Sequence, residues 1–434
     1  MNLKKRIIVR GPVLTMSGYG EQARFALRAL RAHEEHFEIF VIPSTWGHTG
    51  WIHEDTDERR WLDERIRTTA GLMESEESAE AFRQSIDMSL QITIPNEWEK
   101  MAPVNIGYTA GIETTKVTPN WIEKANMMDR IVVVSNHSKN SFEETEYTAT
   151  NNMTQEQVEL KCTVPITAVN YPVKKFDSVD LNLDFDYDFN YLAVAQWGPR
   201  KNLDNTIRWF VEENFDQEVG LVIKTFIRRG NVIDRFYTEG RVQNFLSQYK
   251  DRKCKIYLLH GDLTDQEMHS LYQHEKIKAL ISLTHGEGFG LPLFEAAYNG
   301  LPVIAPGWSG QADFLYAPFK SKNRKTKSKL KAYFAEVNYT MQPIPEFAKW
   351  PGVIAEDSMW CEPEQGSYKM RLRQMRKNYD KWQKKALYLQ KWIHENFTEE
   401  KQYKAFADAV LPAREEELVD VSQWLDSMKV REFE

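Results

Sequence analysis

The sequence has few cysteines and no long apolar run. Its three cysteines, Cys162, Cys254 and Cys361, are odd in number and far apart, which is typical of a reducing compartment and gives no zinc-binding pair. No apolar stretch approaches the ~20 residues that a bilayer crossing needs. The apolar start at residues 7–9 ends before Pro12 and is too short for a signal peptide. We therefore expect a cytoplasmic protein without a transmembrane segment.

The chain also lacks a large excess of charge of either sign. It has 56 lysines and arginines against 63 aspartates and glutamates, a formal net charge of −7. This balance argues against a protein whose whole surface coats nucleic acid, while a local basic patch stays compatible with it. With 434 residues, 42% hydrophobic and 27% charged, the chain has the composition of a globular protein with large cores. Two α/β domains fit this length.

Short β-rich runs alternate with helical stretches, which is typical of parallel sheets with crossover helices. The clearest helix is predicted at residues 20–33, where Ala23, Leu27 and Leu30 recur on one face. In the first part of the chain, strands are predicted at residues 6–10, 37–42, 90–94, 104–108, 130–135 and 166–170.

The acidic and aromatic stretch at residues 184–190 is predicted to be an interdomain linker, because a second alternation of strands and helices starts after it. That alternation has predicted strands at residues 191–196, 220–225, 255–260, 279–283 and 302–305. The predicted fold is therefore α/β, with two Rossmann-like, doubly wound domains at residues 1–180 and 181–398. Ligands of such sheets bind outside the carboxyl edges of the strands, so we expect the site in a cleft between the domains.

The end of the chain is predicted to be helical. Residues 366–396 and 399–426 are rich in Lys, Gln, Leu, Trp and Glu. The last helix, at about 399–426, is expected to cross back and pack on the first domain.

Residues 284–305 combine a strand, a glycine-rich turn, a helix and a second strand. The glycines allow a tight turn and close approach of a ligand. The helix from about Gly290 points its amino end at the cleft, where free N–H groups and the helix dipole favour a phosphate. Glu287 lies in the turn and Glu295 about one turn inside the helix, so both carboxylates can face one pocket. A solvated helix start is the alternative, but it leaves the glycines unexplained.

Glu287 and Glu295, set in Gly-Glu-Gly-Phe-Gly-Leu-Pro-Leu-Phe-Glu-Ala, resemble the E-x7-E signature of retaining GT-B glycosyltransferases, especially glycosyltransferase family four. The segment 308–313, Trp-Ser-Gly-Gln-Ala-Asp, resembles the family's second glycine turn. The resemblance covers the second domain well and the first domain loosely, through residues 17–20, 133–135 and 169–173. It implies a GT-B enzyme that transfers a sugar from a nucleotide-diphosphate sugar to an acceptor hydroxyl, with retention and without a metal or other cofactor.

The resemblance also assigns roles in the second domain. Glu287 is expected at the hydroxyls of the transferred sugar and Glu295 at the donor ribose. The amide-rich turn is expected to bind the donor and stabilise the leaving diphosphate. Its residues are Gly288, Phe289, Gly290 and Leu291.

A diphosphate also needs cations. Arg200 and Lys201 follow the strand predicted at 191–196, at the edge where the ligand is expected; an exposed pair in a turn is the alternative. The family usually has an arginine directly after this strand and a lysine a few residues later. Lys201 fits the lysine position, but Gln196 stands in the arginine position. Arg200 or Lys224 is the candidate replacement.

In the first domain, Gly18 and Gly20 lie between the first strand and the first helix, where the family brings a loop against the diphosphate. A plain tight turn is the alternative. Tyr108 and Glu113 follow an inner strand and are candidates to face the acceptor.

The segment 46–53 contains two tryptophans and two histidines. His48 and His53 have no third metal ligand nearby at a recognised spacing, so no metal site is predicted. Trp46 and His48 are instead candidates for acceptor contact, and a structural loop is the alternative. The Asp-x-Asp patterns at 184–188 lie in the expected linker and are interpreted as solvated.

Residues 320–331 hold seven basic residues and no acid. Such a run can bind nucleic-acid phosphates. However, the preceding helix, opened by Gly310, should carry the chain to the amino edge of the sheet, away from the cleft, so a solvated loop is favoured.

The sequence leaves the sugar, the nucleotide and the acceptor open. The acceptor is either a glycan, including a lipid-linked one, or a hydroxylated base in DNA, which would have to flip out of its stack. Two alternatives to a glycosyltransferase remain: a nucleotide-sugar epimerase with the same two-domain architecture, and a non-catalytic protein that binds nucleotide sugars or nucleic acid.

Overall fold

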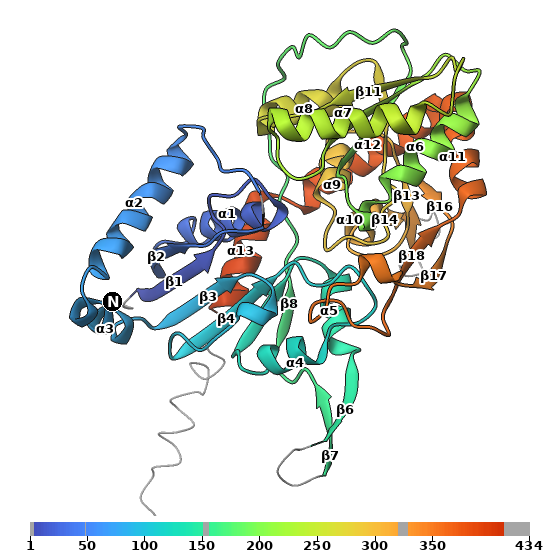
Figure 1. Ribbon diagram of the computed structural model, residues 1–434. Helices are drawn as coiled ribbons and strands as arrows, with labels where there is room; N and C mark the ends of the chain where they lie inside the picture. Colours follow the sequence, from blue (N-terminus) through green and yellow to red (C-terminus); the bar gives the residue numbers. More distant parts are fainter. Residues whose placement is uncertain (1–3, 48, 151–155, 320–328, 412–434) are drawn as a thin grey trace, which may run out of the picture.

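The chain forms two lobes, each built on a parallel sheet, and residues far apart in sequence meet between the lobes (Figure 1). The computed structural model describes residues 4–47, 49–150, 156–319 and 329–411. Three predicted features lie wholly or partly outside the described residues: His48, residues 320–328 of the basic run, and residues 412–426 of the predicted last helix.

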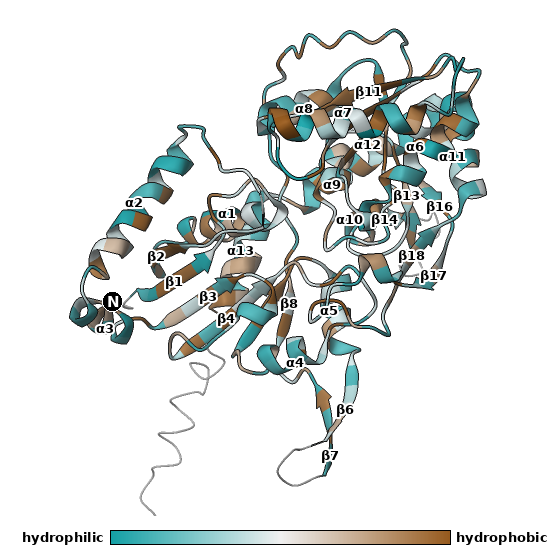
Figure 2. Cartoon of the chain, viewed as in Figure 1, coloured by the Kyte–Doolittle hydropathy of each residue, from teal (hydrophilic) through white to brown (hydrophobic). Residues whose placement is uncertain are grey.

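The first sheet has six parallel strands in the order β2-β1-β3-β4-β5-β8. Most positions in its central strands are buried because helices cover both faces of a parallel sheet. Figure 2 shows hydrophobic stretches along these strands and a largely hydrophilic α2. The strands are β1 (Lys5–Gly11), β2 (Phe37–Pro43), β3 (Met88–Ile92), β4 (Val104–Thr109), β5 (Arg130–Val133) and β8 (Ile166–Ala168).

The helices of the first lobe are α1 (Gly18–Arg31), α2 (Asp57–Leu72), α3 (Glu76–Gln84), α4 (Pro119–Ala125) and α5 (Asn136–Glu143), with a 3-10 turn, η1, at Pro95–Glu97. An antiparallel hairpin of β6 (Glu146–Thr150) and β7 (Gln157–Lys161) was not expected from the sequence. Its residues are mostly exposed, so it lacks the apolar pattern that reveals a strand.

The second sheet also has six parallel strands, in the order β11-β10-β9-β12-β13-β16. They are β9 (Asn190–Gln196), β10 (Gly220–Phe226), β11 (Lys255–Leu259), β12 (Ile277–Ile281), β13 (Val303–Pro306) and β16 (Ala335–Val337). The two parallel sheets with their crossover helices confirm the predicted doubly wound α/β class.

The second lobe contains the 3-10 turns η2 (Pro199–Lys201) and η3 (Glu346–Ala348), and the helices α6 (Leu203–Asn214), α7 (Val232–Leu246), α8 (Asp265–Gln273), α9 (Leu291–Tyr298), α10 (Ala312–Leu315), α11 (Gln365–Lys377) and α12 (Tyr379–Asn396). Two antiparallel pairs complete it: β14 (Tyr316–Phe319) with β15 (Lys329–Ala332), and β17 (Tyr339–Pro343) with β18 (Met359–Pro363). The helix predicted at 366–396 is divided at Asn378, whose backbone is not helical.

One predicted strand is too long. The sequence predicts a strand at 130–135, but β5 ends at Val133 and Ser135 begins the next helix. Ser135 has an extended backbone, and its hydroxyl accepts the N–H of Ser138 as the N-cap of α5. A cap residue continues the extended conformation of a strand, which explains the error.

The chain crosses between the lobes twice. Residues 169–189 lead from β8 to β9, and after α12 the chain returns to the first lobe as α13 (Glu399–Val410). The N–H of Val173 donates to the carbonyl of Phe397 (2.8 Å), so the two crossings are joined. α13 packs on α1, and the ring of Phe406 lies 5.4 Å from that of Phe25.

A third connection comes from the segment 345–359 of the second lobe. Asn96 donates to the carbonyl of Gly352 (2.9 Å), and the N–H of Thr115 donates to the carbonyl of Met359 (3.0 Å). Val353 is buried in the first-lobe cluster around Trp121. These contacts join the two lobes on the side of the molecule that carries β18.

We expect Phe406→Ala to lower the free energy of unfolding by about 3–5 kcal/mol, because it removes a fully buried ring between α13, α1 and the first sheet. Chemical denaturation followed by circular dichroism measures the change. Leu387→Ala on the exposed side of α12 is the control and should change stability by less than about 0.5 kcal/mol. Equal effects of the two substitutions would contradict the packing role of α13.

Candidate functional site

The strand order of the second sheet reverses at β9 and β12, whose carboxyl ends lie side by side. The chain runs outward from β9 to β10 and β11, then returns to β12 on the other side of β9. The loops that follow β9 and β12 therefore leave in opposite directions, and such a reversal is where open α/β sheets bind ligands. The loop after β9 contains η2, and the loop after β12 contains the glycine-rich turn.

The two loops are joined by backbone and side-chain bonds. The N–H of His285 donates to the carbonyl of Arg200 (2.8 Å). The left-handed backbone of Asn202 (φ 52°) ends η2 and starts α6, so the chain turns sharply after Lys201. Arg200 and Lys201 are thereby held beside the glycine-rich turn.

Glu287 lies at the centre of a charged cluster. Lys201 Nζ donates to both carboxylate oxygens of Glu287, at 2.6 and 2.7 Å. Arg200 Nη1 donates to Glu287 Oε2 (3.2 Å) and to the carbonyl of Gly286 (2.6 Å). Arg200 Nη2 also pairs with Glu113 Oε1 (3.1 Å), so one guanidinium joins carboxylates from both lobes. The structure brings together four of the predicted site residues: Glu287, Lys201, Arg200 and Glu113.

Burial and charge act in opposite directions in this cluster. Burial opposes ionisation of Glu287, but the charges of Lys201 and Arg200 outweigh it and lower the pKa of the carboxyl. Burial lowers the pKa of the Lys201 ammonium, and the Glu287 charge opposes that effect. The carboxylate is therefore ionised at neutral pH, with two cations held against it.

The glycines of the turn admit the backbone of the first lobe. A Cβ at Gly286 would lie 2.2 Å from the carbonyl oxygen of Glu113, and one at Gly288 would lie 2.6 Å from that of Ala110. Gly290 has a left-handed backbone (φ 95°) and precedes α9, with Leu291 as the first helical residue. The sequence predicts that these glycines let a ligand approach. The structure shows that Gly286 and Gly288 also let the first lobe approach, a role that the sequence did not indicate.

Glu295 belongs to a separate environment on α9. Its Oε2 accepts the hydroxyl of Tyr272 (2.9 Å). Burial raises the pKa of Glu295 to about 7, and the Tyr272 hydrogen bond opposes that rise. Within the described residues, no hydrogen bond or ion pair that involves Glu295 reaches the cluster at Glu287.

Gly18 and Gly20 lie at the start of α1, as expected, but with different surroundings. Ser17 caps the helix by accepting the N–H of Gly20 (3.0 Å). A Cβ at Gly20 would lie 2.0 Å from the carbonyl oxygen of Thr15, so the turn itself requires glycine. Gly18 is exposed and faces open space, which leaves room for a ligand at this position.

Tyr108 is not at an acceptor-facing surface, and this prediction is wrong. Its side chain is fully buried, and its ring lies 5.0 Å from that of Phe406 on α13. Both faces of the parallel sheet are covered, so a residue near the end of β4 can point into the core.

Trp46 packs beside the start of α1. Its ring is 4.1 Å from that of Tyr19, whose hydroxyl bonds to Thr109 Oγ1. The loop is also tied to the first lobe because the carbonyl of Gly50 accepts the N–H of Met16 (2.8 Å). The predicted role of His48 falls outside the described residues.

Lys224 and Gln196 form hydrogen bonds away from the charged cluster at Glu287. Lys224 on β10 is buried and donates to the carbonyl of Gly261, which holds the loop after β11. Gln196 donates to the carbonyl of Ile227 (3.0 Å). Of the two candidate replacements for the family arginine, Arg200 is the one that reaches Glu287.

Sequence reasoning missed several residues that contact the turn. Ser135 Oγ, from the first lobe, donates to the carbonyl of Gly288 (2.6 Å). His285 stacks on Trp360, with ring centroids 4.2 Å apart, and its Nδ1 donates to the carbonyl of Cys361 (2.7 Å). A serine directly after a strand was the available signal for Ser135; the partners of His285 are too distant in sequence to be inferred.

The described residues contain no group of three or more His, Cys, Asp or Glu side chains placed to hold a metal ion. Asp186, in the Asp-x-Asp segment, accepts the hydroxyl of Tyr257 (3.1 Å) on the second lobe. Among the helices of the described part, none combines the length and apolarity of a membrane span.

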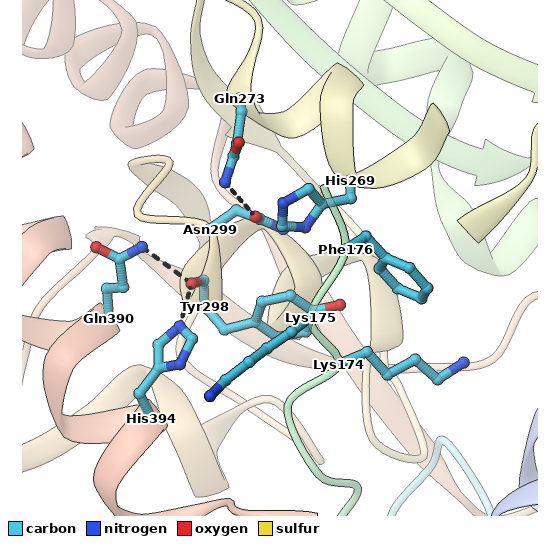
Figure 3. Close-up of a pocket in the computed structure, with 9 residues that line it drawn as sticks. All are labelled: Lys174, Lys175, Phe176, His269, Gln273, Tyr298, Asn299, Gln390 and His394. Carbon is cyan, nitrogen blue, oxygen red and sulfur yellow. Dashed lines mark hydrogen bonds between the residues drawn. The ribbon is translucent and has the colours of Figure 1, made fainter. Parts of the chain in front are cut away.

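A cavity of about 290 Å³ lies at the far end of α9 from Gly290 (Figure 3). It is lined by the segment after β8 and by α8, α9 and α12, and Figure 3 shows Gln390 and His394 both bonded to the carbonyl of Tyr298. None of the cluster residues around Glu287 lines it. This cavity is therefore distinct from the site at the carboxyl ends of β9 and β12.

Solved structures with this fold extend over nearly the whole chain, whereas no family model and no curated protein matches it. Sucrose-phosphate synthase from Thermosynechococcus elongatus is 13% identical, with a TM-score of 0.57 over 98% of this chain and 100% of that one. HepE from Anabaena, in complex with UDP and glucose, is 11% identical, with a TM-score of 0.55 over 93% and 98%. The E. coli structure described as trehalose-6-phosphate bound with UDP-2-fluoro glucose is 9% identical, with a TM-score of 0.53 over 94% and 100%.

These similarities confirm the fold that the motif implied. The chain has the GT-B architecture, in which two Rossmann-like, doubly wound domains face each other across a cleft. At such low identity the similarity concerns the fold, and the chemistry must be argued from the residues of this chain.

We expect Glu295→Gln to change how stability depends on pH. A carboxyl whose folded-state pKa is raised from 4.5 to about 7 binds more protons when folded, so its contribution to stability falls as pH rises through that interval. The variant should therefore gain roughly 1–3 kcal/mol relative to wild type between pH 5 and pH 8, less than the full linkage value because Glu295 is partly exposed.

Denaturant unfolding at the two pH values measures this difference. Glu64→Gln, which removes an exposed carboxylate on α2, should show no such pH-dependent gain. A constant difference between Glu295→Gln and wild type at both pH values would show that burial does not hold the proton on Glu295.

Proposed function

We propose that the protein is a retaining glycosyltransferase that moves a sugar from a nucleotide-diphosphate sugar to an acceptor hydroxyl without a metal ion. The observation that carries this proposal is the pair of half-buried cations, Lys201 and Arg200, held on the buried Glu287 at the carboxyl edge of the second sheet. The GT-B fold and solved neighbours that contain UDP or a UDP-sugar analogue support it. The proposed domains are residues 1–180, joined by α13, and residues 181–398.

The cations suit the charge that develops during transfer. When the bond between the anomeric carbon and the diphosphate oxygen breaks, its electron pair stays on that oxygen. Lys201 and Arg200 stabilise the resulting negative charge, together with the N–H groups of the turn from Gly288 to Leu291. Their positions are set before the donor arrives, so little reorganisation opposes the reaction.

The two glutamates bind the two sugars of the donor. Glu287, ionised and fixed by its cations, accepts hydrogen bonds from hydroxyls of the transferred sugar. Glu295 accepts them from the ribose, because it lies further along α9. The acceptor oxygen attacks the anomeric carbon from the side of the leaving group, and its proton passes to a leaving phosphate oxygen. This route retains the anomeric configuration without a protein nucleophile.

Arg200 replaces the arginine that the family usually has in the position of Gln196. It reaches Glu287 from the turn after β9, and its second contact is Glu113 of the first lobe. Lys224 is not the replacement, because its ammonium is bonded to the carbonyl of Gly261. Glu113 then lies beside the reacting centre on the acceptor side, and Trp46 lies further out near Gly18.

We expect Lys201→Ala to reduce donor hydrolysis about 100-fold to 1000-fold, since it removes a cation from the leaving group. Glu295→Ala should mainly weaken donor binding. Release of nucleoside diphosphate from a panel of nucleotide sugars, selected first by thermal shift, measures both effects. Lys391→Ala, at an exposed lysine on α12, is the matched control.

Unchanged turnover in folded Lys201→Ala and Glu295→Ala proteins would reject the proposed site. Conversion of the donor into its epimer, without release of nucleoside diphosphate, would identify an epimerase instead. Donor binding without any turnover, in the presence of a range of acceptors, would identify a binding protein.

A further inference from the structure

The first two turns of α7 carry a cluster of exposed apolar side chains. Val232, Ile233, Phe236 and Tyr237 are between 65% and 82% exposed. Single exposed apolar residues are ordinary, but a contiguous group on a protein surface marks an interaction site. We call these four residues the α7 apolar surface.

The segment that carries this surface is held in place. Asn231 caps α7 by accepting the N–H of Asp234 (2.9 Å). The carboxylate of Asp234 accepts the N–H groups of Ile227 (3.0 Å) and Arg228 (2.8 Å) and pairs with His260 (2.9 Å). The apolar side chains therefore project from a fixed helix start.

The charge around this surface is positive. Arg228, Arg229 and Arg235 are exposed, and the single acid between residues 227 and 237, Asp234, is buried. Arg235 pairs with Glu239, just beyond this segment. In a chain with a net charge of −7, the segment 227–237 combines exposed apolar groups with three arginines. The carboxylates beside it are Asp262, which lies against Gly230, and Glu239, which Arg235 neutralises.

The α7 apolar surface lies close to the first lobe. α7 follows the carboxyl end of β10, on the same edge of the sheet as the turn at Glu287. Gly50 of the first lobe and Gly230, just before α7, both approach Asp262: a Cβ on them would lie 3.8 and 2.6 Å from its carboxylate oxygens. Trp51, beside Gly50, is also exposed.

A cavity of about 590 Å³ opens within this segment. Ile227, Arg229, Ile233 and Tyr237 are among its lining residues. It therefore offers apolar walls next to a guanidinium. That combination fits an amphiphile with an anionic head and an apolar tail.

We propose that the α7 apolar surface docks on an anionic lipid bilayer. The protruding aliphatic and aromatic side chains insert at the level of the headgroups, and the arginines contact lipid phosphates. A bilayer is favoured over a protein partner because the side chains project strongly from a short helical segment that cations flank. Docking would bring the cleft to the bilayer, so the acceptor would be a lipid or lipid-linked hydroxyl; this last step rests on the proposed function.

Co-sedimentation with vesicles tests the docking. The full-length protein should bind vesicles of equimolar phosphatidylcholine and phosphatidylglycerol and not vesicles of phosphatidylcholine alone. Phe236→Ser should reduce the partition coefficient about tenfold or more, and Arg228→Gln about fivefold. Phe347→Ser, at a phenylalanine that is 77% exposed elsewhere on the second lobe, is the matched control and should bind like wild type.

Absence of wild-type binding to the anionic vesicles would overturn the proposal, as would equal binding by Phe236→Ser and wild type. If sedimentation shows wild-type dimers that Phe236→Ser dissociates, and neither protein binds vesicles, the surface joins two copies of the chain instead. Donor hydrolysis without vesicles should be unchanged in Phe236→Ser, so failure of docking and failure of the proposed transferase activity are distinguishable.

Discussion

The site depends on one buried carboxylate that two cations neutralise. Removing any member of such a group leaves an uncompensated charge in a desolvated place, which costs far more than the net contribution of the pair. Glu287 therefore fixes Lys201 and Arg200 before any ligand is present. Because Arg200 also contacts Glu113, the same electrostatic constraint joins the turn after β9, the turn after β12 and a loop of the first lobe. The local geometry of the site follows from these contacts.

The glycine-rich turn is shaped by both lobes. Gly286 and Gly288 lie against carbonyl groups of the first lobe, and Ser135 donates to the carbonyl of Gly288. A side chain at either glycine would push the lobes apart before it met a ligand. Three parts of the chain therefore meet at this turn: α9, the loop that carries Arg200 and Lys201, and the amino end of α5. Because all three parts contact the same turn, the short sequence pattern of that turn can specify a site that spans two domains.

Much of the architecture followed from local patterns, because β-branched runs and Gly-Leu-Pro helix starts report strands and helices directly. The grouping of Lys201 with Glu287 was also predictable, since both follow strands that end at one sheet edge. The hairpin of β6 and β7 was missed because its exposed residues carry no apolar period. The burial of Tyr108 was missed because a parallel sheet hides both faces of a strand. The contact between Arg200 and Glu113 depends on how the lobes meet, which no local pattern encodes.

The paired crossings between the lobes restrict how the protein can open. Because Val173 and Phe397 are bonded where both crossings pass, a rotation of the lobes about that place would strain the chain less than a translation. Sliding of one sheet past the other would stretch both crossings at once. Opening by rotation separates the opposite side first, where Gly352 and Met359 hold the first lobe. Any such rotation would also have to break the ion pair between Arg200 and Glu113, which joins the lobes beside the glycine-rich turn.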